Sequence, residues 1–211
     1  LSGNELAANF KKHVLANTGE SLKVREGEKV SSIEKNDTGF VIKIEGKSEE
    51  FLTKTVLIAS GSGRRKLIAK NADALEHKGL TYCASCDGPL YEGLDVVVIG
   101  GGNAGFESAA QLLAYCKSVT LLHRNDTFRA DEVTVEKVLK NPKMKAIKNV
   151  DILEVKGDKF VEGLVYKDKN RSEEIELKVS GIFVEIGQIP NTDFAKGVVP
   201  LDQYGRVKIN P

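Results

Sequence analysis

The sequence predicts an α/β fold built on a parallel sheet, and two observations predict it. A strand predicted at residues 95–99, with an apolar run at 96–99, ends in a glycine-rich turn that opens a helical pattern at residues 104–115. A second apolar run at 118–122 is followed by a second helical pattern at 130–140. Strands that alternate with helices in this way pair in parallel, because each helix returns the chain to the same end of the sheet.

Composition excludes several classes of protein. The 211 residues are 41% hydrophobic, enough for one large core or two small ones. The net charge of +1 does not favour nucleic acid or an anionic membrane as a partner. The longest apolar runs have the length of a strand and are too short to span a bilayer, and the first residues lack the pattern of a signal peptide. We expect a cytoplasmic protein that binds neither nucleic acid nor a membrane.

The first residues predict a core-facing helix. Every fourth residue from Leu6 to Val14 is apolar, Ser2 or Asn4 can cap the start, and Gly19 suits the stop. Alternating segments at 22–24, 29–33 and 40–44 then predict half-buried antiparallel strands.

A continuous apolar run at residues 55–59 predicts a buried strand. It ends in the small residues 60–63, where a backbone could approach a ligand closely. A Gly/Ser loop that leads into a linker is the alternative. The polar, irregular stretch at 64–78 predicts a connection between domains.

The part of the chain after residue 140 predicts strands. Polar turns separate three alternating segments, which indicates hairpins, at residues 150–155, 160–166 and 174–179. An apolar run at 181–186 ends at Gly187, and a short hairpin is expected around residues 203–205.

The glycine-rich turn predicts a dinucleotide site. Gly100 allows the tight turn, Gly102 lets a pyrophosphate approach the backbone, and Gly105 lets the helix pack on the strand. The helix that starts at Asn103 and Ala104 presents free N–H groups to the phosphates.

The end of the second predicted strand indicates which dinucleotide binds. An NAD site usually carries an acidic residue there, whereas this chain has His123 and Arg124, with Arg129 one turn further on. Guanidinium groups hold a 2′-phosphate, so these residues favour NADP. A solvated basic loop, partly neutralised by Asp126, is the alternative.

Cys83 and Cys86 form a CxxC pair, which indicates redox chemistry by thiol–disulfide exchange. Structural zinc is the alternative, but the scattered histidines supply no second ligand pair. Asp87 could shuttle a proton to or from a thiolate, or it could cap a helix or turn. Cys116 falls at the end of a helical pattern and is expected to be buried.

Five motifs in this order resemble the low-molecular-weight thioredoxin reductases and the related flavoprotein subunit of alkyl hydroperoxide reductase. Residues 83–88 are similar to the CAxCDG redox motif, 98–104 to VIGGGN(S/T), and 123–130 to HRRxxFRA. Residues 181–192 are similar to GxFxxIGxxPNT, and 56–61 to the ATG strand that contacts FAD.

The resemblance implies a Rossmann-like, three-layer ββα, FAD/NAD(P)-binding fold in two domains, of which this chain is expected to be a part. We expect a partial FAD domain at 1–66, a connection at 67–79, an NADPH domain that carries the CxxC at 80–187, and the return to the FAD domain at 188–211. No metal is expected. The full-length protein is expected to be a homodimer.

The resemblance also implies a path for electrons, from NADPH to FAD, to the Cys83–Cys86 disulfide, and then to thioredoxin or a thioredoxin-like protein. Cys86 would face the flavin, Cys83 would attack the partner, and Asp87 would handle the proton. The expected cofactor contacts are Gly100, Gly102, Asn103, Ala104, Gly105, Glu107, His123, Arg124, Arg129, Ile186, Gly187, Ala59 and Gly61.

Two departures from the family leave alternatives open. The second arginine of the HRRxxFRA motif is Asn125 here, which weakens the case for NADP and keeps open an alkyl hydroperoxide reductase flavoprotein that prefers NADH. The glycine motif that opens the family's FAD domain and the GxFAAGD segment that closes it are not in this sequence. The chain by itself is therefore expected to be a colourless nucleotide-binding module without turnover.

Overall fold

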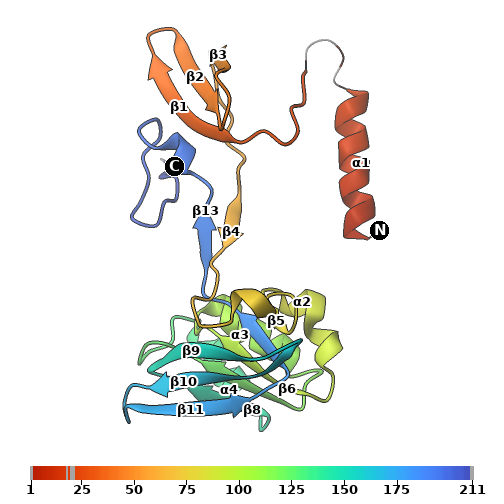
Figure 1. Ribbon diagram of the computed structural model, residues 1–211, viewed down its shortest axis with the longest axis vertical. Helices are drawn as coiled ribbons and strands as arrows, with labels where there is room; N and C mark the ends of the chain where they lie inside the picture. The colour runs from red at the N-terminus through yellow and green to blue at the C-terminus, as the bar shows by residue number, and fades with distance from the viewer. Residues whose placement is uncertain (1, 18, 20–21, 210–211) are drawn as a thin grey trace. The chain divides into compact units, whose positions relative to one another are not determined.

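The computed structural model describes residues 2–17, 19 and 22–209 (Figure 1). The chain divides into two compact units. Unit 1 comprises Leu1–Gly61 and Pro190–Pro211, and unit 2 comprises Ser62–Ile189. Leu1 and Pro211, the outer limits of the predicted domains, lie outside the described residues.

Unit 2 has three layers, as predicted. Its central layer is a parallel five-stranded sheet in the order β5-β12-β6-β7-β8. The strands are β5 (Leu80–Thr81), β12 (Gly181–Val184), β6 (Asp95–Ile99), β7 (Ser118–Leu122) and β8 (Met144–Ile147).

The two outer layers of unit 2 cover opposite faces of this sheet (Figure 1). One is helical and contains α3 (Asn103–Leu112) and α4 (Glu132–Leu139). The other is an antiparallel sheet of β9 (Val150–Gly157), β10 (Val161–Asp168) and β11 (Glu173–Lys178).

Strand β6 contributes side chains to the packing of both outer layers. Its side chains alternate between faces, so Val96 and Val98 pack in the cluster with α3 and α4, whereas Val97 and Ile99 pack in the cluster with β9 and β10. All four are buried. The run is therefore continuously apolar, as in a parallel strand covered on both faces.

The predicted strands 95–99 and 118–122 are confirmed to the residue, and β8 was not predicted. The structure differs from the predicted connection at 67–79. Leu67, Ala72 and Leu75 of this segment are buried in the core of unit 2, where Asp73–Leu75 form a short 3₁₀ helix. Ala72 and Leu75 are three residues apart, as in a helical turn, but one short turn in a polar stretch does not reveal burial from the sequence pattern.

In unit 1 the predicted first helix is α1 (Gly3–Ala16). Ser2 caps it, because its Oγ accepts the N–H of Glu5 while the Glu5 carboxylate accepts the N–H of Ser2. The core-facing orientation is not observed, since no residue of α1 is buried and Phe10 is 64% exposed. Local hydrogen bonds suffice to form a helix, whereas burial needs a packing surface that the described residues do not supply.

The rest of unit 1 contains an antiparallel sheet of β1 (Val30–Asn36), β2 (Gly39–Ile44) and β3 (Glu50–Thr53). The first two strands confirm the prediction, β3 was not predicted, and residues 22–24 form no strand. A 3₁₀ helix, Asp193–Ala195, follows in the C-terminal part, and an antiparallel bridge between Leu201 and Val207 closes the expected turn around 203–205.

The buried strand predicted at 55–59 is wrong. Residues 54–61 form no strand, and Leu57 is 92% exposed. A parallel strand must exchange hydrogen bonds with neighbours, and the described residues place no strand beside this segment. Directly after it, β4 (Ser62–Arg64) pairs with β13 (Gln188–Pro190), a pairing that the sequence pattern did not predict.

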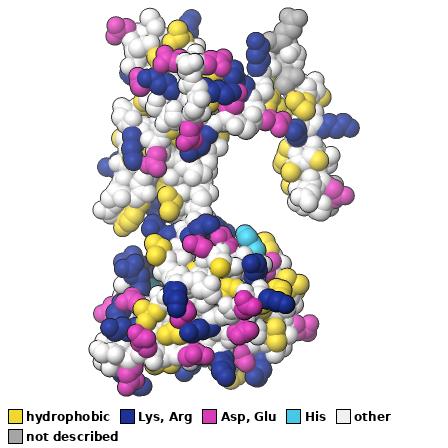
Figure 2. Space-filling view, in the orientation of Figure 1, with side chains coloured by type: hydrophobic (Ala, Val, Ile, Leu, Met, Phe, Trp, Pro, Cys, Tyr) yellow, Lys and Arg dark blue, Asp and Glu magenta, His cyan; other side chains and the backbone are white. Residues whose placement is uncertain are grey.

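Acidic and basic side chains are mixed over the visible face of unit 2, as the near-zero net charge suggests (Figure 2). No described helix combines the length and the apolar character that crossing a bilayer requires.

Candidate nucleotide and disulfide site

The glycine turn, residues 100–105, follows β6 at the carboxyl edge of the parallel sheet. The neighbours of β6 are β12 on one side and β7 on the other, so the strand order reverses here. Open α/β sheets bind ligands at such a switch point.

Gly100 and Gly105 of this turn leave no room for a side chain beside the neighbouring backbone. Gly100 has φ +127°, and a Cβ there would lie 2.1 Å from the carbonyl oxygen of Glu185. A Cβ on Gly105 would lie 2.0 Å from the carbonyl oxygen of Gly100. Because glycine has no Cβ, β6, β12 and α3 lie closer together here than they could with any other residue at these two positions.

Gly102 differs, because a Cβ there would meet nothing within 4 Å. It is the N-cap of α3 and supplies no side chain to the first N–H groups of that helix. Open space in front of unpartnered helix N–H groups fits the pyrophosphate of a dinucleotide. Ala104 and Glu107 are exposed on the first two turns of α3. Asn103 instead accepts the N–H of Asp131 through its Oδ1, at 2.8 Å, and so holds the following loop.

His123 is buried behind the turn, and both of its ring nitrogens have backbone partners. Nδ1 accepts the N–H of Gly101 at 3.1 Å, so Nε2 carries the proton that it donates to the carbonyl of Thr127 at 2.9 Å. Burial lowers the pKa of His123 more than the bond to Thr127 raises it, and the positive charges of Arg129 and Arg124 lower it further. His123 was predicted to contact the cofactor, and this geometry indicates that it positions the turn.

The lowered pKa of His123 predicts a loss of stability in mild acid. The unfolded imidazole binds a proton near pH 6.5, whereas the folded one resists it to lower pH. The free energy of unfolding should therefore fall as the pH drops through about 6.5 towards the folded pKa, and should be unaffected by His123 above about 7. Urea unfolding of His123→Asn should show a weaker pH dependence than wild type. His77→Asn, at an exposed position, should keep the wild-type slope, and equal slopes in all three proteins would contradict the assignment.

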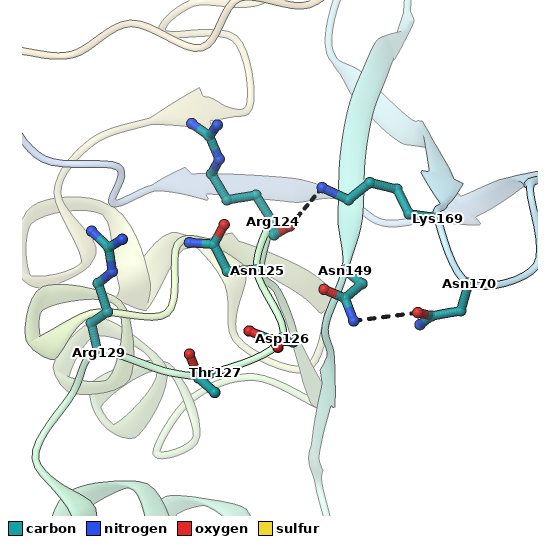
Figure 3. Close-up of a pocket in the computed structure, with 8 residues that line it drawn as sticks. All are labelled: Arg124, Asn125, Asp126, Thr127, Arg129, Asn149, Lys169 and Asn170. Carbon is teal, nitrogen blue, oxygen red and sulfur yellow. Dashed lines mark hydrogen bonds between the residues drawn. The ribbon is translucent and has the colours of Figure 1, made fainter.

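Beyond the carboxyl end of β7 lies an open hollow of about 520 Å³, lined by Arg124, Asn125, Asp126, Thr127, Arg129, Asn149, Lys169 and Asn170 (Figure 3). Arg124 and Arg129 extend to the same side of their loop (Figure 3). Within the described residues neither guanidinium has an ion pair or hydrogen bond. The N–H of Arg129 donates to the carbonyl of Gly101 at 2.8 Å, which ties this loop to the glycine turn. Two free guanidinium groups at this position fit a 2′-phosphate.

The redox pair forms a disulfide between Cys83 and Cys86, on either side of the first residues of α2 (Ala84–Asp87). Cys86 is exposed and Cys83 is half-buried. The N–H of Cys86 donates to Sγ of Cys83 at 3.2 Å, a bond that would stabilise a thiolate at Cys83 after reduction. Cys116 is buried, as predicted, and burial raises the pKa of its thiol.

Asp87 is half-buried, and Oδ2 of its carboxylate accepts the hydroxyl of Thr81. Asp87 occupies the N-cap position of a 3₁₀ helix, Gly88–Tyr91, but its side chain makes no capping hydrogen bond. The same Thr81 oxygen accepts the N–H of Cys83 at 3.4 Å. Because its acceptor side faces Cys83, the single hydroxyl proton of Thr81 is directed to Asp87. Sequence reasoning missed Thr81, which belongs to no motif beyond its proximity to Cys83.

The disulfide and the glycine turn lie at opposite ends of α3. Ser85 Oγ donates to Gln111 Oε1 at 2.7 Å, so α2 is attached to the last turn of that helix. Gln111 is nine residues after Gly102, which places it roughly 14 Å along the helix axis. The glycine turn and the disulfide are therefore two separate places in unit 2.

Glu185, which sequence reasoning also missed, lies at the end of β12 beside the glycine turn. Its Oε1 accepts the hydroxyl of Ser108 at 2.8 Å, and Arg64 lies 3.5 Å from its other oxygen. Burial raises the pKa of the Glu185 carboxyl. Its neighbour Ile186 packs against the core of unit 2, and Gly187 is exposed with φ +99°.

The flavin contacts proposed at Ala59 and Gly61 stay a prediction. Both are exposed and lie in the segment that forms no strand. The open space at Gly102 and the helix N-terminus beside it fit a nicotinamide dinucleotide at the glycine turn.

Comparison with known proteins places this geometry in a family context. The model of the family described as pyridine nucleotide-disulphide oxidoreductase matches residues 2–211. An alkyl hydroperoxide reductase component of Staphylococcus epidermidis is 35% identical over 209 residues, which covers 99% of this chain and 40% of that protein. A protein of Bacillus subtilis named NADH dehydrogenase is 34% identical over 208 residues, with the same coverage. The chain thus spans about two fifths of the length of these relatives.

Solved structures agree with this. Thioredoxin reductase of T. acidophilum is 34% identical with a TM-score of 0.73, over 98% of this chain and 66% of that one. Thioredoxin reductase of Giardia duodenalis is 28% identical with a TM-score of 0.77, over 97% of this chain and 66% of that one.

Proposed function

The chain belongs to the pyridine nucleotide-disulphide oxidoreductase family, as its motifs indicated, and from this membership we propose that the protein is an NADPH-dependent disulfide reductase of the thioredoxin reductase type. Members of this family use flavin and nicotinamide cofactors. The observation that carries the proposal is that unit 2 holds both the glycine turn and the Cys83–Cys86 disulfide.

The residues of this chain have separate tasks in the proposed reaction. The glycine turn and the N-terminus of α3 bind the pyrophosphate, and Arg124 and Arg129 bind the 2′-phosphate. A bound flavin supplies two-electron transfer between a nicotinamide and a disulfide. Ala59 and Gly61, which are exposed, would contact that flavin.

Reduction of the disulfide breaks one S–S bond and takes up two electrons, which leaves two thiolates; each thiolate that takes up a proton becomes a thiol. Asp87 lies next to Cys86 in the sequence, and its carboxylate would relay a proton between solvent and the thiolate of Cys86. The Cys83 thiolate then attacks a disulfide of a thioredoxin-like partner, and Cys86 displaces the mixed disulfide to release the reduced partner. The exposure of the disulfide segment supports access by a protein partner.

NADH is the alternative electron donor. Asn125 stands where the family signature has an arginine, and one relative is named NADH dehydrogenase. The unpaired Arg124 and Arg129 beside the hollow support NADPH.

The proposed path is tested by trapping thiols. The full-length protein, loaded with flavin, is incubated with NADPH without oxygen and then alkylated. The mass of the peptide that contains Cys83 and Cys86 is measured by mass spectrometry. We expect two added alkyl groups with NADPH and none without it. Flavin-free protein is the control and should keep its disulfide. A disulfide that stays closed while NADPH is consumed would contradict the proposal.

The chain by itself is also a candidate nucleotide-binding module, because unit 2 is compact and contains the whole glycine turn. We expect the isolated chain to bind NADPH while showing no flavin absorbance spectrum. Purified protein that carries stoichiometric flavin would contradict this second assignment.

A further inference from the structure

The hollow beyond β7 contains a cation that comes from a distant part of the chain. Lys169, in the turn between β10 and β11, lines it together with Arg124 and Arg129 (Figure 3). We propose that Lys169 determines specificity for NADP by supplying the positive charge that Asn125 lacks. This inference rests on the nucleotide assignment of the proposed function.

Hydrogen bonds hold the Lys169 ammonium group at the rim of the hollow. Nζ donates to the carbonyl of Arg124 at 2.7 Å and to Oδ1 of Asp151 at 3.3 Å. An ammonium group has three donors, so one is left for a ligand. The side chain is 39% exposed, which leaves the group accessible.

The backbone around Lys169 is fastened to the arginine loop as well. The N–H of Lys169 donates to the carbonyl of Asn149 at 2.9 Å, and the N–H of Asn149 donates to the carbonyl of Asn125 at 3.1 Å. Asn149 has φ +60°, a conformation that asparagine tolerates better than most residues. The turn and the loop therefore form one rim, in which Lys169 is held beside Arg124.

The charges around the hollow favour an anion. Its lining includes the cations Arg124, Arg129 and Lys169 and the single carboxylate Asp126. Asp151 partly offsets Lys169 through their ion pair. A 2′-phosphate brings two negative charges near neutral pH, whereas the 2′-hydroxyl of NAD brings none. A cation at this rim therefore strengthens the binding of NADP and leaves the binding of NAD almost unchanged.

The test measures binding of nucleotide halves, which needs neither flavin nor turnover. Calorimetry compares 2′,5′-ADP with 5′-AMP on the complete chain. Lys169→Met keeps the aliphatic stem and removes the charge. We expect it to weaken 2′,5′-ADP by about five- to tenfold while 5′-AMP changes by less than about twofold. Lys169→Arg should keep the wild-type ratio of affinities.

Lys159→Met is the matched control. Lys159 lies in the turn between β9 and β10, at the other end of the hairpin, and is exposed. It should leave both affinities unchanged. If Lys169→Met unfolds, Lys169→Gln, which keeps a donor for the carbonyl of Arg124, carries the same expectation.

Two results would overturn the inference alone: unchanged affinities in Lys169→Met, or equal losses for both nucleotides, which would mean that Lys169 only supports the loop. Wild-type protein that binds 2′,5′-ADP no more tightly than 5′-AMP would overturn the inference together with the preference for NADPH. The disulfide reductase function is tested separately, by the thiol-trapping experiment.

Discussion

Replacing Cys83 by serine is expected to lower NADPH-driven reduction of a thioredoxin disulfide by about 10³-fold or more in the flavin-loaded protein. Cys83 is the proposed nucleophile, and its Sγ already accepts the N–H of Cys86. A serine hydroxyl at this position cannot open a partner's disulfide or close one with Cys86. The measurement is thioredoxin-dependent consumption of NADPH.

The same experiment separates the roles of the two cysteines. Cys86→Ser should also stop turnover, but it should leave Cys83 able to form a stable mixed disulfide with the partner, visible on a non-reducing gel. Cys116→Ala, which changes a buried cysteine outside the Cys83–Cys86 disulfide, is the control and should retain activity. Trapping by Cys83→Ser instead of Cys86→Ser would show that the roles are reversed.

Gly105→Ala is expected to destabilise the protein by about 3 kcal/mol, although alanine normally favours a helix. The new Cβ would lie 2.0 Å from the carbonyl oxygen of Gly100, and that oxygen belongs to backbone held by β6. Helix α3 would have to move away from the strand. Urea unfolding measures the loss, and an unchanged midpoint would show that the helix can shift at little cost.

Gly102→Ala is the matched comparison, with the opposite outcome. Its φ of −97° is open to any residue, and a Cβ there meets nothing within 4 Å. We expect a change in stability below about 1 kcal/mol, together with an affinity for NADPH at least about tenfold weaker, because the methyl group would occupy the proposed space of the pyrophosphate. Full affinity in this variant would place the pyrophosphate elsewhere.

Much of unit 2 could be predicted from residues that are close in sequence. The run at 96–99, the glycines after it and the helix that follows form one local unit, and their order reflects backbone requirements. The same holds for the CxxC pair, whose cysteines are separated by three positions and close a disulfide within one turn of chain. The predicted layers follow from the alternation of Val96 to Ile99 between two cores.

Other predictions failed because the predicted burial depended on neighbouring segments that would have to pack against the element. The run at 55–59 has the composition of a buried strand, but among the described residues it has no neighbouring strand, and none of its residues is buried. The apolar stripe of α1 likewise predicted burial that the described residues do not provide. Composition reports what a segment could bury, whereas burial itself requires a complementary surface.

The glycine turn, the redox pair and the basic loop after the second strand could therefore all be recognised from residues that are neighbours in the sequence. The contacts that support these motifs became evident only from the folded chain. It turned His123 into a support for the turn, brought Thr81 to Asp87, and placed Lys169 beside Arg124, 45 residues away in the chain. Motifs can be recognised in a sequence because they depend on backbone geometry over a few residues. These contacts cannot, because they depend on how strands, helices and turns pack together.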